Sequence, residues 1–193
     1  TTRVDGGQIK EGDITEAKLQ TLINPVAEVS NNAFNIGVLG FKVAVNNGLT
    51  VFNLVDGVVD EFHDNTGVDT SESSNATYDA SADTFSNSTT SMTLISDTFT
   101  ANTTPSTARI VLFAELPDGT SDFTISATRD NTTFNNITLT DEGYQAGSSG
   151  IKIFSGSTSL TGSSSPQVQV RWKIVGSSLS GTNKIHGVSL QWK

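Results

Sequence analysis

The chain contains no cysteine and few charged residues. The absence of cysteine among its 193 residues excludes a disulfide framework and thiol chemistry. Charged residues make up 16% of the chain, against roughly 25% in an average globular protein. Ser, Thr, Asn and Gly take their place, a composition typical of turn-rich β proteins. The length suits one β domain with an appendage, and intrinsic disorder is the competing interpretation, mainly for residues 64–90.

Lys and Arg are missing from the whole stretch between Lys42 and Arg109, and the net charge is −9. Nucleic-acid binding needs a cationic footprint, so the sequence excludes it. The acidic stretch is expected to be a solvated surface, with docking on a basic partner and cation binding as alternatives. Its acidic residues are Asp56, Asp60, Glu61, Asp64, Asp69, Glu72, Asp79, Asp83 and Asp97.

Long apolar runs are also missing. No segment approaches the roughly 20 apolar residues that span a bilayer, so no membrane insertion is expected. The first residues, 1–5, are polar and lack the apolar core of a secretion signal. We therefore expect synthesis in a cytoplasm without export through a cleaved signal.

Recognisable catalytic motifs are missing as well. The two histidines, His63 and His186, have no second His or Cys at ligand spacing, which argues against a zinc site. No nucleophile elbow, Walker loop or dinucleotide fingerprint occurs. The carboxylate pairs Asp118/Asp122 and Asp141/Glu142 are too common in loops to indicate a glycosidase. The sequence therefore predicts a protein that is not an enzyme and has no organic cofactor.

Calcium is the one candidate cofactor. Residues 60–69 are dense in hard oxygen ligands, which Ca²⁺ prefers. The order of an EF-hand loop fails, however, because Gly67 stands in the wrong place. An Asx-rich turn is the alternative interpretation.

An apolar ladder with alternating steps of three and four residues runs through residues 19–43. This spacing is that of a coiled-coil seam, and branched residues dominate it after Leu22, which favours a trimer. The alternative is an amphipathic helix pair packed on its own β domain. The predicted trimer interface comprises Leu19, Leu22, Val26, Val29, Ala33, Ile36 and Val43, with Gly40 in the same phase.

Helix signals precede and interrupt this ladder. Asp13 is a candidate N-cap, and Asn24-Pro25 divides the segment into predicted helices at 14–23 and 25–39. Asn47-Gly48 then predicts a hairpin across residues 43–51. We expect an N-terminal arm and helical attachment segment at 1–45, an acidic linker or wrapping segment at 46–90, and a β head at 91–193.

The last hundred residues alternate apolar and polar side chains with a period of two. Such strands bury one face, so two sheets must meet, and the pattern indicates an antiparallel β-sandwich of jelly-roll type. Trp172 and Trp192 are expected in the core or at its rim, with a bulge at Gly187. The predicted strands lie near residues 92–95, 107–115, 123–128, 137–139, 151–153, 167–174 and 185–192.

Three aromatic residues beside polar loops are candidate stacking platforms for a sugar ring. They are Tyr78, Tyr144 and Phe154, and the alternative for each is an ordinary half-buried aromatic. The turn Thr128–Phe134 is rich in hydrogen-bonding side chains, and we expect its role to be structural.

Two blocks of the sequence carry a resemblance to a known family. The first is residues 35–75, NIGVLGFKVAVNNGLTVFNLVDGVVDEFHDNTGVDTSESSN. The second is the β part, with TARIVLFAEL at 107–116, SATRDNTTF at 126–134 and KIHGVSLQWK at 184–193. Together these blocks resemble virion structural proteins of tailed phages, particularly marine phages. The turn near residue 130 reads Asn131-Thr132 where the family usually carries a Gly pair.

This resemblance implies a homotrimeric appendage with a jelly-roll-like head, located in the virion and bound to other virion proteins. A tail fibre or head fibre would contact a host-surface glycan, whereas a capsid decoration protein would stabilise the phage head. A glycan-degrading virion enzyme is a further alternative, disfavoured by the missing acid/base pair.

Overall fold

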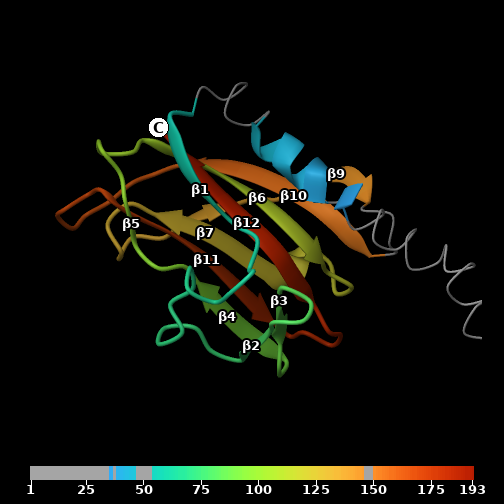
Figure 1. Ribbon diagram of the computed structural model, residues 1–193. Coiled ribbons are helices and arrows are strands. Elements are labelled where there is room, and N and C mark those ends of the chain that lie inside the picture. The colour runs from blue at the N-terminus through green and yellow to red at the C-terminus, as the bar shows by residue number, and fades with distance from the viewer. Residues whose placement is uncertain (1–34, 37, 47–53, 146–149) are drawn as a thin grey trace, which may run out of the picture.

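The computed structural model describes residues 35–36, 38–46, 54–145 and 150–193, which form a mainly β protein with two antiparallel sheets (Figure 1). The predicted β-sandwich is confirmed. The strands are β1 (Asp56–Asp60), β2 (Ala76–Asp79), β3 (Thr84–Asn87), β4 (Ser91–Ile95), β5 (Phe99–Thr100), β6 (Thr107–Glu115), β7 (Phe123–Thr128), β8 (Asn135–Ile137), β9 (Thr140–Gln145), β10 (Ile151–Ser159), β11 (Gln169–Ser177) and β12 (Lys184–Trp192).

The larger sheet has seven strands in the order β2-β3-β12-β6-β10-β9, with β1 pairing β12 as well. Its three central strands, β6, β10 and β12, each have nine residues. The register of β12 on β6 shifts between Ile185 and Gly187, which confirms the expected bulge. These central strands form the frame to which the other elements attach.

The smaller sheet has five strands in the order β4-β11-β7-β8, with β5 also pairing β11. Alternating residues of β11 point into the space between the sheets, where Val170, Trp172 and Ile174 are fully buried. Trp192, from the larger sheet, is 4% exposed and joins the same core. Both tryptophans therefore lie in the core, as the sequence predicted.

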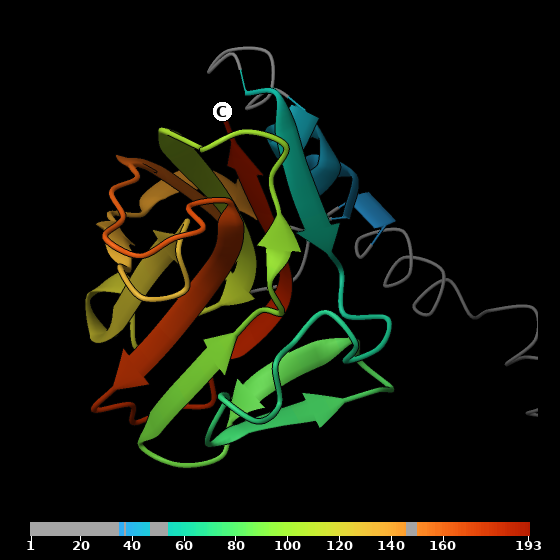
Figure 2. The ribbon, with the colours of Figure 1, turned by 90° about the vertical axis from the view of Figure 1, so that its left-hand side faces the viewer.

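A helical segment, residues 35–36 and 38–46, covers the outer face of the larger sheet (Figure 2). Phe41 and Val45 pack there in a second apolar cluster, separate from the core between the sheets. The side-chain nitrogen of Gln191, on β12, donates a 2.9 Å hydrogen bond to the Val45 carbonyl near the end of the helix. The sheet residues of this cluster are Val111, Phe113, Ile151 and Ile153.

The predicted boundary between linker and head is wrong. The acidic stretch supplies β1, β2 and β3 to the larger sheet, so the sandwich begins at Asp56 and not at residue 91. Its Asp and Ser residues make tight turns between short strands, as where Asp79 accepts hydrogen bonds from the backbone and hydroxyl of Ser81. Tyr78 and Phe85 give the hairpin of β2 and β3 its apolar contact, with ring centroids 5.1 Å apart.

The predicted hairpin across residues 43–51 is wrong at its start, because residues 43–46 are helical and 47–53 lie outside the described residues. A helix in this position buries Phe41 and Val45 against the sheet, and that tertiary contact overrides the strand expected at residues 43–46. The predicted helix at 14–23 and residues 25–34 of the second also lie outside the described residues.

Arg171 fixes the irregular segment between β1 and β2. Its side chain is 5% exposed and forms ion pairs with Asp69 at 2.8 Å and Glu72 at 3.0 Å. Its Nε also donates a 2.7 Å hydrogen bond to the carbonyl of Ser96, the residue that follows β4. A buried guanidinium with several acceptors is strongly oriented, which explains how a segment with few apolar side chains lies in place.

Asp130 has the corresponding role at the turn after β7. It is 3% exposed, and its oxygens accept hydrogen bonds from four backbone N–H groups, those of Thr132, Thr133, Ser163 and Ser164. Burial acts to raise the pKa of this carboxyl, but these donors prevail and hold it well below the usual range. The turn is therefore a structural tie between the β7–β8 and β10–β11 connections.

Asp130→Asn should lower the free energy of unfolding by about 2 kcal/mol, since hydrogen bonds to a charged group contribute roughly 1.5–3 kcal/mol. The lowered pKa means that the carboxylate stabilises the fold above about pH 4 and loses that effect as the pH falls. Denaturant unfolding from pH 7 to pH 3 should therefore show a steeper acid loss in the parent than in the variant. Asp97→Asn, at an exposed site, is the control, and equal acid slopes in parent and D130N would contradict the prediction.

Candidate functional site

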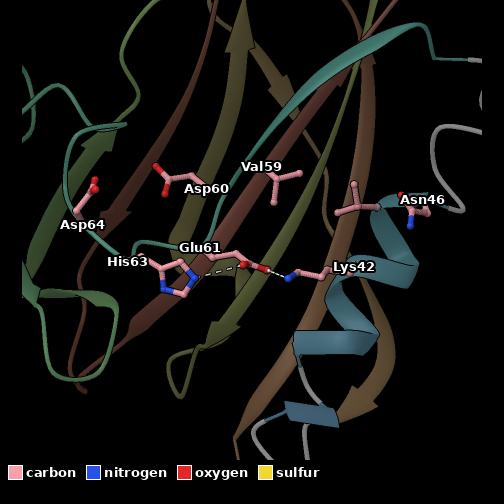
Figure 3. Close-up of a pocket in the computed structure, with 8 residues that line it drawn as sticks. Lys42, Asn46, Val59, Asp60, Glu61, His63 and Asp64 are labelled. Carbon is pink, nitrogen blue, oxygen red and sulfur yellow. Dashed lines mark ion pairs between the residues drawn. The ribbon is translucent and has the colours of Figure 1, made fainter.

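A hollow of about 520 Å³ lies between the helical segment and β1; we call it the helix–β1 hollow (Figure 3). Glu61 stands at its centre, with Lys42 approaching one carboxylate oxygen at 3.2 Å and His63 the other at 3.5 Å. His63 also lies 3.1 Å from Asp83, beyond the hollow. The remaining lining residues are Val45, Asn46, Val59, Asp60 and Asp64.

Most of the charged side chains that line this hollow are acidic, and these acidic groups form ion pairs or accept hydrogen bonds. The hydrogen bond with Asp83, followed by the nearby carboxylates, raises the pKa of His63. Burial raises the pKa of Asp60, whose Oδ1 accepts a 2.9 Å hydrogen bond from the Phe62 backbone. A side chain at position 67 would collide with the other oxygen of Asp60, which explains why glycine occupies that position.

The predicted calcium run does not converge on one point. Asp64 accepts hydrogen bonds from the backbone and hydroxyl of Thr66. Asp69 accepts hydrogen bonds from Ser71, Glu72 and Arg171. Within the described ranges, no group of three or more His, Cys, Asp or Glu side chains is placed to hold a metal ion. The geometry is that of the Asx-rich turn, the alternative named from the sequence.

The helical segment carries a second apolar surface, the exposed strip, formed by Ile36, Leu39 and Val43. These side chains are 55%, 61% and 47% exposed. At about 100° per residue, Leu39 and Val43 point roughly opposite to Phe41 and Val45, which face the sheet. The segment therefore has one apolar face packed on its own sheet and another open to solvent.

The exposed strip shares two residues with the predicted trimer seam, and its third residue, Leu39, lies outside the ladder. Ile36 and Val43 belong to the ladder, and Gly40 lies between them, half-buried. Phe41 and Val45 were not assigned a role from the sequence, although a four-residue step of apolar side chains beside the ladder was the available signal. The other ladder residues, Leu19, Leu22, Val26, Val29 and Ala33, lie outside the described residues.

A further hollow of about 480 Å³, the loop-end hollow, opens where β6 ends and β10 begins. Phe154, one of the three predicted stacking residues, lies in its wall but is only 5% exposed and belongs to the core. Lys152 and Asp141 pair across it at 2.8 Å. Thr120 and Thr182 add hydroxyl groups at its rim.

Tyr78, another predicted stacking residue, is half-buried, its ring packs on Phe85, and its hydroxyl donates a 2.8 Å hydrogen bond to the Phe62 carbonyl. Tyr144, the third, belongs to β9, the edge strand beside β10. Phe154 thus lies in the wall of a hollow with most of its ring covered, and Tyr78 uses its ring and hydroxyl within the fold.

The carboxylates of Asp118 and Asp141, near the loop-end hollow, are held ionised. Hydrogen bonds from Ser180 and Asn183 lower the pKa of Asp118 to about 2, and the hydrogen bond from Lys152 lowers that of Asp141. Glu142 accepts a hydrogen bond from the Ser155 hydroxyl. A glycosidase acid needs a raised pKa, and neither Asp118 nor Asp141 has one.

Comparison with known proteins gives little further information. No protein-family model matches the chain, and no curated protein does either. A solved structure, that of the carbohydrate-binding module TmCBM27 described for specific mannan recognition, aligns over 72% of this chain and 97% of its own. The identity is 9% and the TM-score 0.38, so nothing about function is drawn from this similarity. In the part of the chain that the structure describes, no helix is long and apolar enough to cross a membrane.

Calcium should not change the thermal stability of the protein. Since a ligand that binds only the folded state raises Tm by mass action, Tm in EDTA and in excess CaCl₂ should agree within about 1 °C. Differential scanning calorimetry provides the measurement, with MgCl₂ as the ionic-strength control. A calcium-specific rise that Asp64→Asn abolishes would restore the calcium hypothesis for residues 60–69.

Proposed function

We propose that this chain is a non-enzymatic structural component of a tailed-phage virion that associates with copies of itself through the exposed strip. The observation that carries self-association is the helical segment with apolar side chains on two opposite faces, one of them open to solvent. The virion assignment is supported by the resemblance of residues 35–75 and of the β part to phage structural proteins.

The partner of the exposed strip is a second copy of the chain. A helix with apolar side chains on two opposite faces is normally covered on both, so leaving Leu39 and Val43 in water is unfavourable. The ladder in the sequence keeps the phase of Ile36 and Val43 from residue 19 onward, which is the spacing expected of one continuous seam. Branched residues at both seam positions favour a trimer, and three copies on one axis bind with raised effective concentration.

Contact with a host-surface glycan is the role we propose for the head of a fibre. The loop-end hollow combines what sugar recognition uses: hydroxyl groups of Thr120 and Thr182, the charged pair Lys152–Asp141, and an apolar wall that includes Phe154. Hydroxyl and charged groups would bind sugar hydroxyls, while the apolar wall would cover the less polar side of the ring.

Capsid decoration is the second candidate role within the virion, and self-association is compatible with it. The two roles differ in copy number, because a decoration protein covers the capsid lattice whereas fibres are few. Quantitative mass spectrometry of purified virions distinguishes them. Host-cell binding by the isolated protein would favour the fibre, and loss of capsid stability on its removal would favour decoration.

Leu39→Asp should convert the proposed trimer into monomers, because association would then bury an unpaired carboxylate, at a cost of several kcal/mol. Light scattering coupled to size-exclusion chromatography measures the mass. Val55→Asp is the matched control, since Val55 is 73% exposed but lies outside the exposed strip, and it should leave the mass unchanged. A monomeric parent protein, or a trimer retained by L39D, would contradict the assignment.

Thr182→Val should weaken binding of the protein to host cells by roughly three- to tenfold, the equivalent of one lost hydrogen bond. Thr77→Val, on β2 and equally exposed to solvent, is the matched control and should bind like the parent. Flow cytometry of cells with labelled protein gives the affinity. Equal loss in both variants, or in neither, would count against the loop-end hollow as the contact site.

A further inference from the structure

Both histidines of the chain, 123 positions apart in the sequence, line one cavity of about 190 Å³. This cavity, which we call the histidine cavity, lies between the helical segment and the larger sheet. Val38 and Phe41 border it from the helix, and Phe113 borders it from the sheet. Any change in histidine charge therefore occurs directly beneath the contact that holds the helical segment.

His186 forms the inner wall of the cavity, with a side chain that is 9% exposed. Its ring centroid lies 5.4 Å from that of Phe113, which in turn stacks on Phe41 of the helix at 5.9 Å. Its Nε2 lies 2.9 Å from Glu115, while its buried Nδ1 has no hydrogen-bond partner among the described residues. A protonated imidazole would need an acceptor at Nδ1, so water would have to enter under Phe41.

Burial lowers the pKa of His186, and the opposing attraction of Glu115 does not overcome it. Acidification through that pKa therefore places a charge in the cavity and weakens the contact between helix and sheet.

His63 lies at the outer wall and responds in the opposite direction. Its ring stands between the carboxylates of Glu61 and Asp83, and Glu61 also pairs with Lys42 of the helix. The Asp83 hydrogen bond raises the pKa of His63, so its stabilising charge is present at low pH and is lost as the pH rises through that pKa. Loss of that charge removes the ionic bridge between Glu61, which pairs with Lys42 of the helix, and Asp83, the residue before β3.

We propose that the two histidines form a pH-dependent clasp, which holds the helical segment on the sheet most tightly when His63 is charged and His186 is neutral. The segment is released at higher pH, when His63 loses its charge, and at lower pH, when His186 gains one. The charged groups that face the two rings from neighbouring elements are Lys42, Asp60, Glu61, Asp64, Asp83, Glu115 and Lys184. The clasp acts within one copy of the chain and does not depend on the proposed self-association.

Thiol labelling tests the clasp cleanly, because the chain has no cysteine of its own. Val45→Cys places a small thiol at a position 5% exposed beneath the helix, where it reacts only after release. Ser177→Cys, at the exposed end of β11, reports the intrinsic reactivity of the thiolate at each pH. The ratio of the two labelling rates between about pH 5 and 8, the range in which histidine charge changes, measures release.

We expect this ratio to pass through a minimum and to rise by at least about threefold on both sides, since labelling of a buried thiol tracks the open population. His186→Gln should abolish the rise at low pH, and His63→Gln should abolish the rise at high pH. If H186Q does not fold, Glu115→Gln replaces it and should move the low-pH rise to a lower pH. The same measurements in a Leu39→Asp background separate release from dissociation of an oligomer.

A ratio of the Val45→Cys and Ser177→Cys labelling rates that stays constant across this pH range, with both histidines present, would overturn the clasp. So would a low-pH rise that persists in H186Q, because a merely structural role of His186 would change the level of the ratio and not its dependence on pH. If His63→Gln abolished the rise at low pH as well as the rise at high pH, the two histidines would not act separately, and this would also contradict the clasp.

Discussion

The apolar outer face of the larger sheet is the constraint on which the rest of the structure depends. Strand β6 is buried on both sides, with Ile110 and Leu112 facing the core and Val111 and Phe113 facing away from it. An exposed patch of this kind is unfavourable in water, so a further layer must cover it. The helical segment supplies that layer through Phe41 and Val45, and its position forms one wall of the helix–β1 hollow and of the histidine cavity.

The fold of the β part could be predicted from the sequence because each strand there buries one face. The alternation in residues 167–174 predicted β11 and placed Trp172 in the core, where it is fully buried. The strands β1 and β2 could not be found in this way. They have exposed and half-buried residues in alternation but few large apolar side chains, since they lie at the edges of the sheet.

The candidate sites were predicted less well, for a different reason. The ladder predicted that Ile36 and Val43 belong to a trimer interface, but it gave no sign that Phe41 and Val45 would take the opposite face of the helix. The sequence could not predict that the two histidines line one cavity. They are brought to it by the pairing of β12 with β6 and by the position of the segment after β1. The alternation of neighbouring residues in the sequence indicates where a strand lies. Contacts between segments far apart in the sequence depend on the topology of the fold, which that alternation does not give.

The two interpretations of the ladder, a seam between copies and a helix packed on its own sandwich, prove to be compatible. Phe41 and Val45 fix the helix by one face, and this orients Leu39 and Val43 outward at a defined position on the larger sheet. A helix held rigidly by its own domain loses less conformational entropy on association than a free one would. Any equilibrium that releases the helix from the sheet, including the histidine clasp, therefore also weakens the surface offered to another copy. In the proposed trimer, attachment within the chain and association between chains would be coupled, because the helical segment carries both Phe41 and Val45 and the exposed strip.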